Sequence, residues 1–372
     1  MDIKYFNKKI DELFDIKSGL ISKNKNDFLK NTNSNYIQFK SIFKMNINTN
    51  NFGKVKIKEN ENQNLVEKND LLINMTSENY KEVGYINIYE NKEKVYLNSF
   101  SKILRIKNKE KNYPKYFNYL FQSSKYRNKI IKQSQGITRI NLSLENFKKI
   151  KINYLIDINK QKLIGDFFNK IDQLIEITKE KNKFYKELKK LFSSFIFQLN
   201  DKLMDIKEKK NIIDEICFRK LSNNSIKESN FIGRYPIYSA NKKILGKIEK
   251  YDFTNFIAIS KDGTVGNPFY IQKEGSIINT LEYIFPKKNI DIKYLFYLLQ
   301  TINFKKYEIG TSIKHIYFND WKKEKINLID IKKQKLIGDF FNKIDQLIEN
   351  NSLSIKLLND YKKSFLNIIF KD

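Results

Sequence analysis

Few of the residue types that enzymes use for catalysis occur in this chain. His315 is the only histidine among the 372 residues, so a cluster of histidine ligands for a metal ion is excluded. Cys217 is the only cysteine, which excludes an internal disulfide framework and a zinc site built from several cysteines. A phosphate-binding loop of the GxxxxGK[ST] type is also missing from the sequence. We therefore expect a chain that is not an enzyme and that has no metal site and no cofactor.

Three short segments imitate catalytic motifs without completing them. Asp262–Gly266 contains two glycines but lacks the Lys-Ser/Thr that ends a phosphate-binding loop, so we expect a turn. Asn267–Tyr270 is similar to the Asn/Asp-Pro-Pro-aromatic loop with which adenine-N6 methyltransferases hold a flipped base, but its second proline is missing. Asp205–Lys207 imitates a nuclease motif, and such triplets arise by chance in a chain this rich in lysine.

The basic residues are concentrated in two stretches of the chain. The formal net charge at pH 7 is +28, of which +15 falls in residues 1–155 and +8 in residues 204–327. The stretches 156–203 and 328–372 carry only +3 and +2. An AT-rich genome would raise the lysine content without dividing it so unevenly. Two separate basic bodies indicate a polyanionic partner such as nucleic acid.

The overall composition is that of a folded protein outside the membrane. Hydrophobic residues make up 41% of the chain, with 29 Phe and 22 Tyr, and the length suffices for two domains with cores of their own. No apolar run reaches the length of a membrane span, and the first residues lack the apolar core of a signal peptide. We therefore expect a cytoplasmic location and no membrane partner.

One segment of the chain occurs twice, almost unchanged. Residues 155–176 recur as residues 328–349 with 21 of 22 positions identical, and only Asn159 and Lys332 differ. Weaker echoes of the same duplication join residues 10–13 to 213–216, residues 115–120 to 293–298, and Gly136 and Phe147 to Gly310 and Trp321. The chain is thus predicted to consist of two copies of one unit, each with a divergent body and a nearly invariant tail.

Each tail is predicted to be a long helix. Neither tail contains proline, and Asp157 and Asp330 are the expected N-caps. Apolar residues recur at alternating spacings of three and four, which predicts a coiled coil, with a helical hairpin inside a larger core as the alternative. The predicted seam comprises Ile164, Phe167, Ile171, Leu174, Thr178, Lys181, Tyr185, Leu188, Phe192, Phe195 and Leu199, and, in the second tail, Ile337, Phe340, Ile344, Leu347, Asn351, Ser354, Leu358, Tyr361, Phe365 and Ile368. Its polar interruptions fit parallel and antiparallel pairing equally well.

Each body is predicted to be a mixed α/β domain. Short runs rich in β-forming residues, at 64–74, 94–106, 255–260 and 276–286, are separated by segments rich in turn residues. A short aromatic helix is expected near Pro114–Gln122 in the first body and near Asp291–Gln300 in the second.

This alternation of divergent bodies and repeated helices resembles the specificity subunit of bacterial type I restriction–modification enzymes. Tyr235–Gly246 looks like the opening of a recognition domain of that family, and Ile257–Gly266 looks like its strand and Gly-Thr turn. Gly136–Ser143 looks like its closing segment, and Lys160–Ile164 looks like the start of its helix. The resemblance spans the whole chain, and the alternation is more specific than any single motif. The first body departs most, since only Gly84 remains of its Gly-Thr turn.

The resemblance implies a fold class and a function. The fold would be α+β, with two mixed α/β target-recognition domains, at 1–155 and 204–327, separated by two long conserved helices, at 156–203 and 328–372, that pair as a coiled coil. The chain would read a bipartite site in double-stranded DNA, one half per domain, and dock two methyltransferase subunits and, through them, restriction subunits. A self-contained adenine-N6 DNA methyltransferase and a non-specific DNA-binding coiled-coil scaffold remain as alternatives.

Candidate DNA-contacting residues are loop side chains that can donate or accept hydrogen bonds. Lysine and arginine bind phosphates, whereas contacts to base edges in the major groove give sequence discrimination. Arg139 is the strongest candidate, because arginine binds guanine bidentately and only five arginines occur. The candidates are Ser77, Asn79, Lys81, Thr138, Arg139 and Asn141 in the first body, and Asn241, Lys242, Lys261, Thr264, Thr311, Ser312, Lys314 and His315 in the second.

The near-identity of the tails also predicts two identical docking sites for a partner. The identities extend to polar positions that we expect on the outer face of each helix, where packing alone does not require them. The candidates are Lys162, Asp166, Asn169, Lys170 and Gln173 in the first tail, and Lys335, Asp339, Asn342, Lys343 and Gln346 in the second.

Overall fold

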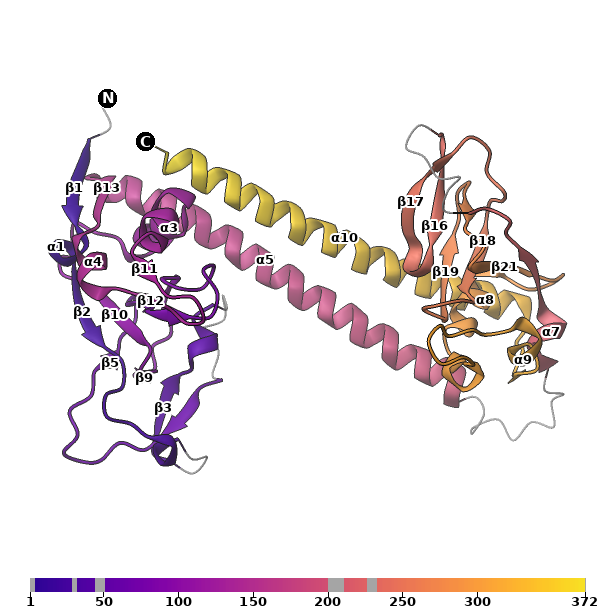
Figure 1. Ribbon diagram of the computed structural model, residues 1–372, viewed down its shortest axis with the longest axis horizontal. Coiled ribbons are helices and arrows are strands. Elements are labelled where there is room, and N and C mark those ends of the chain that lie inside the picture. The colour runs from indigo at the N-terminus through magenta and orange to yellow at the C-terminus, as the bar shows by residue number, and fades with distance from the viewer. Residues whose placement is uncertain (1–3, 29–31, 44–50, 200–210, 226–232, 372) are drawn as a thin grey trace. The chain divides into compact units, whose positions relative to one another are not determined.

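The computed structural model describes residues 4–28, 32–43, 51–199, 211–225 and 233–371 (Figure 1). The chain divides into two compact units. The first consists of Met1–Glu180 together with Leu353–Asp372, and the second consists of Lys181–Ser352. Each unit therefore contains part of both long helices. Within the described residues, no helix has the length and apolar character needed to cross a membrane.

The first unit is built around a four-stranded antiparallel sheet with the strand order β2-β10-β6-β8. These strands are Phe14–Ser18, Ser101–Ile106, Leu71–Asn74 and Ile86–Ile88. A second sheet, β4-β3-β9-β5, comprises Gly53–Val55, Ser34–Ile37, Val95–Leu97 and Leu65–Val66, and its β3 and β9 are parallel. The smaller pairings are β1 (Tyr5–Lys9) with β13 (Lys151–Leu155), and β11-β12-β7 (Ser134–Gln135, Ile140–Leu142 and Thr76–Ser77). The helices of the body are α1 (Ile10–Leu13), α2 (Pro114–Gln122), α3 (Ser124–Ile131) and α4 (Leu144–Lys149).

The second unit repeats this topology. Its main sheet has the order β15-β21-β18-β19, with strands Cys217–Leu221, Leu281–Pro286, Phe256–Ser260 and Gly266–Ile271. Its second sheet, β17-β16-β20, comprises Lys243–Ile248, Tyr235–Ser239 and Ser276–Ile277, and its β16 and β20 are again parallel. The outer pair is β14 (Asn211–Ile212) with β22 (Lys325–Ile326), and the helices are α7 (Ile213–Ile216), α8 (Ile292–Leu299) and α9 (Phe318–Trp321). The duplication predicted from short echoes is thus a duplication of the fold.

The aromatic helices lie where the sequence predicted them. α2 occupies Pro114–Gln122, and α8 occupies Ile292–Leu299 inside the predicted 291–300. The four predicted β-rich runs each contain strands of the observed sheets. The paired residues Phe147 and Trp321 are both buried and belong to α4 and α9 respectively. The predicted fold class, mixed α/β bodies with two long helices, is confirmed.

The two tails are the helices α5 and α10. α5 runs from Ile158 to Ser193 and continues as a π-helical turn at Ser194–Leu199, and α10 runs from Ile331 to Ile369. Both predicted N-caps are present, because Asp157 Oδ1 accepts from the backbone N–H groups of residues 159 and 160 and Asp330 Oδ1 accepts from those of residues 332 and 333. These bonds stabilise the carboxylate and hold the pKa of Asp330 below its ordinary value.

Within each unit, the segments of α5 and α10 run antiparallel. In the first unit, Phe167 contacts Phe365, and Asp172 binds Lys362 at 2.7 Å. In the second unit the rings of Phe192 and Phe340 lie 5.1 Å apart, and Lys189 binds Asp345 at 2.7 Å. In both units a later residue of α5 meets an earlier residue of α10, which settles the direction that the sequence left open.

The pairing uses part of the predicted seam, including Phe167, Phe192, Phe340 and Phe365, together with a second apolar row. The buried positions of α5 include Gln161, Phe168 and Ile175, which the predicted seam did not contain. Its members Phe167 and Leu174 are instead 41% and 49% exposed. The predicted seam was thus incomplete, because each helix carries two apolar heptad rows and the 3-4 spacing was followed along one line only.

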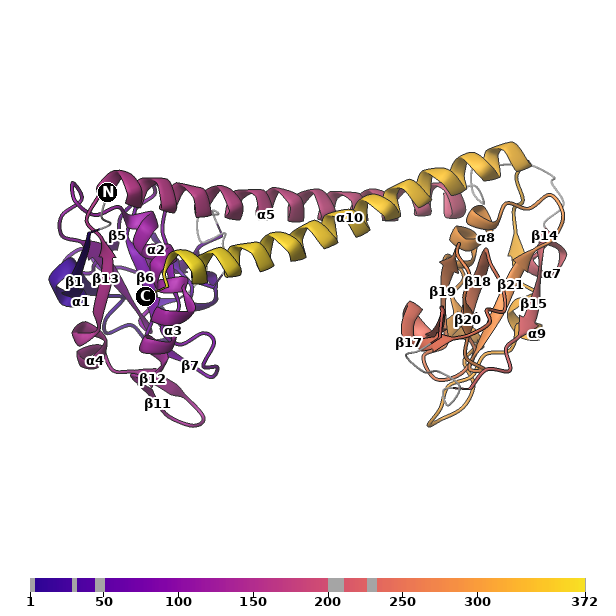
Figure 2. The same ribbon diagram turned by 90° about the horizontal axis from the view of Figure 1, so that it is seen from above.

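The core of each body includes the end of the other body's helix. In the first unit, Leu366 and Phe370 of α10 are buried in the same cluster as Phe117 and Phe168, and Figure 2 shows the C-terminal end of α10 beside α2 and α3. In the second unit, Phe192 of α5 and Ile196 and Phe197 of the π-helical turn that follows it pack against the cluster that contains Phe341. Each unit therefore needs both tails for its complete core.

Candidate nucleic-acid interface and helix faces

In the first unit, the predicted DNA contacts gather around the β11–β12 hairpin. β12 pairs with β7, which places Ile140 opposite Ser77 and brings the turn after β7 beside the hairpin. Tyr80 of that turn donates a hydrogen bond from its hydroxyl to the carbonyl of Gly136 at 3.2 Å. Gly136 has φ 125°, and a Cβ there would lie 2.1 Å from the carbonyl oxygen of Arg139, so this tight hairpin requires glycine. The exposed candidates brought together are Asn79, Lys81, Thr138, Arg139 and Asn141.

Arg139 is exposed at the tip of this hairpin and held in one orientation. Its Nε donates to the hydroxyl of Thr76 at 3.1 Å, and its guanidinium carbon lies 4.8 Å from the centre of the Phe100 ring. Among the described residues, neither terminal nitrogen of Arg139 has a hydrogen-bond partner. Two parallel donors therefore remain for a ligand, as the bidentate contact to guanine O6 and N7 requires.

Ser77 is placed differently from the other candidates of the first unit. Its side chain is buried and donates to Glu82 at 2.8 Å, so it supports the turn from below. Arg127 supports the same turn by donating to the carbonyls of Lys81 and Val83, and burial lowers the pKa of Arg127 from its ordinary value. Thr76 and Phe100, which orient Arg139, were missed from the sequence, because Phe100 lies in the β-rich run 94–106 and Thr76 lies just after the run 64–74, where no local pattern distinguishes it.

The second unit has an equivalent arrangement of loops. Asp262, just after β18, forms a β-bridge with His315, and His315 forms another with Ile309. The backbone N–H of Gly263 donates to the carbonyl of Lys314 at 2.8 Å, which joins the two loops. Gly310 has φ 90° and stands where Gly136 stands in the first unit, since its Cβ would lie 2.3 Å from the carbonyl oxygen three residues on. The predicted contacts brought together here are Lys261, Thr264, Thr311, Ser312, Lys314 and His315.

His315 is the oriented side chain of this second cluster. Its Nδ1 donates to Asp262 Oδ1 at 2.7 Å, and the two side chains are 37% and 32% exposed. Asn241 and Lys242 occupy a separate turn between β16 and β17, where both have positive φ. Among the described residues, no hydrogen bond joins that turn to the loops that carry His315.

The segment that imitates a methyltransferase motif is a strand. Asn267–Tyr270 lies inside β19, which pairs with β18, and Phe269 is buried in the core. Phe269 stands in place of the missing second proline. Tyr270, at the aromatic position of the motif, packs against the core and donates a hydrogen bond to Asn255, whereas a base-holding loop needs this side chain free to stack on the base. Asp262–Gly266, the other glycine-bearing decoy, is the turn that leads into this strand, as expected.

Much of the identity between the tails comes from contacts with the bodies. Gln161 is fully buried, accepting from the backbone N–H of Tyr113 and donating to the carbonyl of Leu155, and Gln334 makes the equivalent bonds to Asp291 and Ile329. Glycine recurs at 165 and 338 because a Cβ would lie 2.8 Å from a backbone nitrogen of α2 and of α8. Identity in these positions reflects packing rather than a shared partner.

A second shared contact is an ionic triad. In the first unit, Tyr119 of α2 donates to Asp172 at 2.9 Å, and Lys362 donates to the same carboxylate oxygen at 2.8 Å. In the second unit, Tyr297 and Lys189 bind Asp345 in the same way. Burial, together with the neighbouring carboxylate, raises the pKa of both tyrosines, so their hydroxyls remain donors.

The predicted docking residues fall into two groups. Lys162, Lys170 and Gln173, and their copies Lys335, Lys343 and Gln346, are exposed. Asp166 accepts from the Tyr113 hydroxyl, Asp339 binds Lys293, and Asn169 and Asn342 are half-buried. The second group is thus at least partly engaged by the bodies.

An exposed apolar row, of which the predicted seam contained only part, lies on both helices. We call it the outer row. In the first unit it comprises Leu163, Phe167, Leu174, Ile177, Leu353, Leu357, Tyr361, Phe365 and Ile368, and in the second unit Phe184, Leu191, Phe195, Leu336 and Phe340. Leu163 and Leu336 are 74% and 72% exposed and are copies of one another. A row of this length and spacing is typical of a helix face that packs against further helices.

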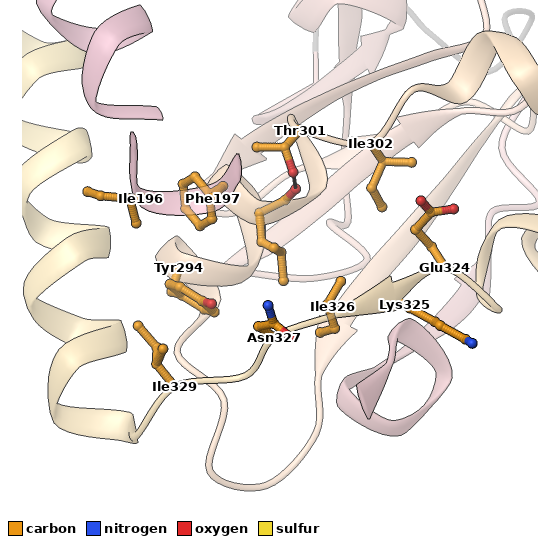
Figure 3. A pocket seen from close by; sticks show the side chains of 11 residues that line it. Ile196, Phe197, Tyr294, Thr301, Ile302, Glu324, Lys325, Ile326, Asn327 and Ile329 are labelled. Atoms are coloured by element: carbon orange, nitrogen blue, oxygen red, sulfur yellow. Dashed lines mark hydrogen bonds between the residues drawn. The ribbon is translucent and has the colours of Figure 1, made fainter. Parts of the chain in front are cut away.

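Each unit also has a small cavity where the long helices meet its body. In the second unit the cavity is about 240 Å³, with Ile196, Phe197, Tyr294 and Ile329 at one end and Glu324 and Lys325 at the other (Figure 3). Its counterpart in the first unit, also about 240 Å³, is lined by Tyr116, Ile369 and Phe370 among others. Because Phe197 and Phe370 occupy equivalent places, these cavities are another product of the duplication.

These observations define the class of the molecule. It is a tandem α+β protein whose two bodies carry different exposed loops and are each followed by a copy of the same long helix. The sequence pattern of the type I restriction modification DNA specificity domain matches residues 3–184 and again residues 197–359. The chain therefore belongs to this family and contains the domain twice.

Known relatives agree with this assignment. A protein of Mycoplasma pneumoniae named as a type I specificity subunit is 30% identical over 152 residues, which cover 38% of this chain and 44% of that protein. The chain thus aligns with less than half of this relative. The S subunit of a type I restriction-modification system from M. genitalium has the same fold, with a TM-score of 0.75, 17% identity, and coverage of 100% of this chain and 97% of that one. A chain from a structure of type I R-M complex assembly matches with a TM-score of 0.53 and 14% identity over 100% and 99% of the two chains.

Proposed function

We propose that this chain is the non-catalytic DNA-specificity subunit of a type I restriction–modification complex. Each unit would read one half of a bipartite site in double-stranded DNA, and the helices would dock two methyltransferase subunits and, through them, restriction subunits. The observation that carries the proposal is one topology used twice with different side chains at equivalent loop positions. His315 stands where Asn141 stands in the first unit, and Asp262 stands where Thr76 stands.

The loops suit the two parts of DNA recognition. Exposed lysines such as Lys81 and Lys314 would bind phosphates, which gives affinity without sequence choice. Arg139 and His315, each held by a neighbouring acceptor, would contact base edges in the major groove. A duplicated fold with divergent loops is what a reader of two unequal half-sites needs.

Selection from a DNA library tests sequence reading. The full chain is incubated with duplexes randomised over about 20 base pairs, with excess random competitor at about 150 mM salt. Two enriched blocks separated by a constant gap are expected. A non-specific scaffold would enrich no block, and a chain that transfers labelled methyl groups from S-adenosylmethionine to DNA without a partner would contradict the proposal of a non-catalytic subunit.

The outer row is the surface that we propose for docking. The patches of the two units contain copies of the same residues, Leu163 and Phe167 in one and Leu336 and Phe340 in the other, together with apolar residues of the facing helix. A partner that binds one patch should therefore bind the other patch through a second copy of itself. Lys170 and Lys343, which are copies of one another, are exposed on the same helices and would lie at the rim of each contact.

The stoichiometry of the complex tests docking. Light scattering of the chain with excess methyltransferase subunit is expected to give two partners per chain. Phe167→Ser and Phe340→Ser should each lower the number to one, and the double variant should bind none. Loss of both partners from a single substitution would show that the two patches are not independent sites.

A further inference from the structure

We propose that His315 reads a base edge in the second half-site and that Asp262 fixes which hydrogen-bonding group it presents, so that base choice in this half-site changes with pH. The inference rests on the proposed function, since it needs both units to contact DNA.

The position of His315 comes from the repeated topology. In the first unit, Asn141 pairs with Thr76 on one side and with Gln135 on the other. In the second unit, His315 pairs with Asp262 and with Ile309 in the same two directions. His315 therefore occupies in the second unit the position that Asn141 of the β11–β12 hairpin occupies in the first. Its 37% exposed side chain is accessible to a ligand.

The contact with Asp262 determines the chemistry of the ring. An ionised carboxylate only accepts hydrogen bonds, so Nδ1 of His315 must carry a hydrogen in this contact. In the neutral ring the proton is then absent from Nε2, and Nε2 is an acceptor. Among the described residues, Nε2 has no partner. The neutral side chain therefore matches the amino group of adenine N6 or cytosine N4 in the major groove.

Protonation reverses what the ring offers. With both nitrogens protonated, Nε2 becomes a charged donor, which matches guanine N7 or O6 and no longer matches an amino group. Histidine is the side chain whose charge ordinarily changes between about pH 5 and 8. Asp262 remains an acceptor for Nδ1 in both states. The ring therefore keeps its orientation while Nε2 changes from an acceptor to a donor.

The charged groups on the two loops around His315 are few. Asp262 is the group within ion-pair distance among the described residues. Lys314 directs its ammonium to the carbonyl of Gly310 at 2.8 Å, and Lys261 and Glu308 belong to the neighbouring segments of the same loops. Lys305 lines the same hollow as Glu308 and Lys314. Asp262 is the charged group that contacts the ring directly.

The first unit supplies an internal control. Arg139 is held by Thr76, a neutral acceptor, and an arginine side chain stays protonated and donates at every pH used here. Discrimination in the first half-site should therefore be independent of pH. A general effect of pH on DNA affinity would change both half-sites, whereas the proposed effect changes one.

The experiment is the library selection on the full chain, performed at about pH 6 and about pH 8. In the second half-site, one position should favour adenine or cytosine at the higher pH and shift towards guanine at the lower pH by roughly fivefold or more. In the first half-site the preferences should be the same at both pH values. Equal preferences at both pH values in both half-sites would overturn the inference while leaving the proposed function intact. Absence of any enriched block would overturn the proposed function itself.

Two variants separate reading from structural support. His315→Asn introduces the residue that the equivalent position of the first unit already carries, so the hairpin should keep its fold, and the pH effect should disappear. Asp262→Asn removes the charge that fixes the tautomer and should weaken the preference at the higher pH. Unchanged selection in the first half-site shows that each variant is folded and bound. If His315→Asn retains the pH-dependent preference, His315 is not the reader.

Discussion

The two ionic triads have the same chemistry but differ in burial, so we expect the same substitution to cost each unit a different free energy of unfolding. The change is Lys362→Met, which keeps most of the aliphatic stem and removes the ammonium. Lys362 and Asp172 are both only 14% exposed, so the substitution leaves a largely buried carboxylate with the Tyr119 hydroxyl as its remaining hydrogen-bond donor. Stranding a buried charge costs about 3–5 kcal/mol, and partial exposure reduces this to about 2–3 kcal/mol for the first unit.

The matched control is Lys189→Met in the second unit. There the lysine and Asp345 are 24% and 34% exposed, so water screens the stranded carboxylate and the expected loss is about 1 kcal/mol. Hydrogen exchange at amides of α2 and α8 reports the opening free energy of each unit separately. The double variant Lys362→Met/Asp172→Asn should recover part of the loss, because it removes the stranded charge.

Two results would refute this reasoning. If both lysine variants destabilise their units equally, burial does not set the energy of the triad. If Lys362→Met leaves the exchange of α2 unchanged, then the end of α10 does not pack on the first unit in solution.

Three further predictions concern the loops, the helix faces and the single thiol. Lys81→Gln should lower the slope of log K against log salt by roughly one, whereas Arg139→Ala should relax base choice at one position by about 1–3 kcal/mol, and competition titrations at several salt concentrations separate the two effects. Phe168→Ala should destabilise the first unit by about 3–5 kcal/mol because Phe168 is fully buried, while the neighbouring Phe167→Ala should cost far less and impair partner binding, as urea unfolding and light scattering would show. Burial raises the pKa of the Cys217 thiol to about 12, so a disulfide reagent at about pH 8 should react at least about a hundredfold more slowly with the folded chain than with the chain in urea, and rapid reaction of the folded chain would contradict the buried position.

The features that follow from local sequence were predictable. Caps, helix lengths and the aromatic helices depend on neighbouring residues, and Asp157, Asp330 and Pro114–Gln122 lie where the residue types predicted. The duplication was also visible, because near-identity over 22 positions needs no knowledge of the fold.

The features that depend on contacts between distant segments were not predictable. Heptad spacing allowed two apolar rows on each helix, and only the fold determines that Phe168 is buried and Phe167 is exposed. Identity in the tails suggested partner docking at Asp166, whereas its carboxylate accepts from Tyr113 of the body. The roles of Thr76 and Asp262 as acceptors also depend on strand pairings that no local pattern reveals.

The C-terminal end of α10 completes the core of the first unit, and this has a consequence for folding during translation. Residues up to Glu180 leave the ribosome first, but the core that they form also includes Leu366 and Phe370, which follow the whole of Lys181–Ser352. At about 5–20 residues per second, that intervening stretch takes roughly 10–35 s to synthesise. During this interval the apolar surface around Tyr116 and Phe168 is not yet covered by Leu366 and Phe370. It could then aggregate with other chains or bind a chaperone. The order of translation and the order of folding therefore differ in this protein.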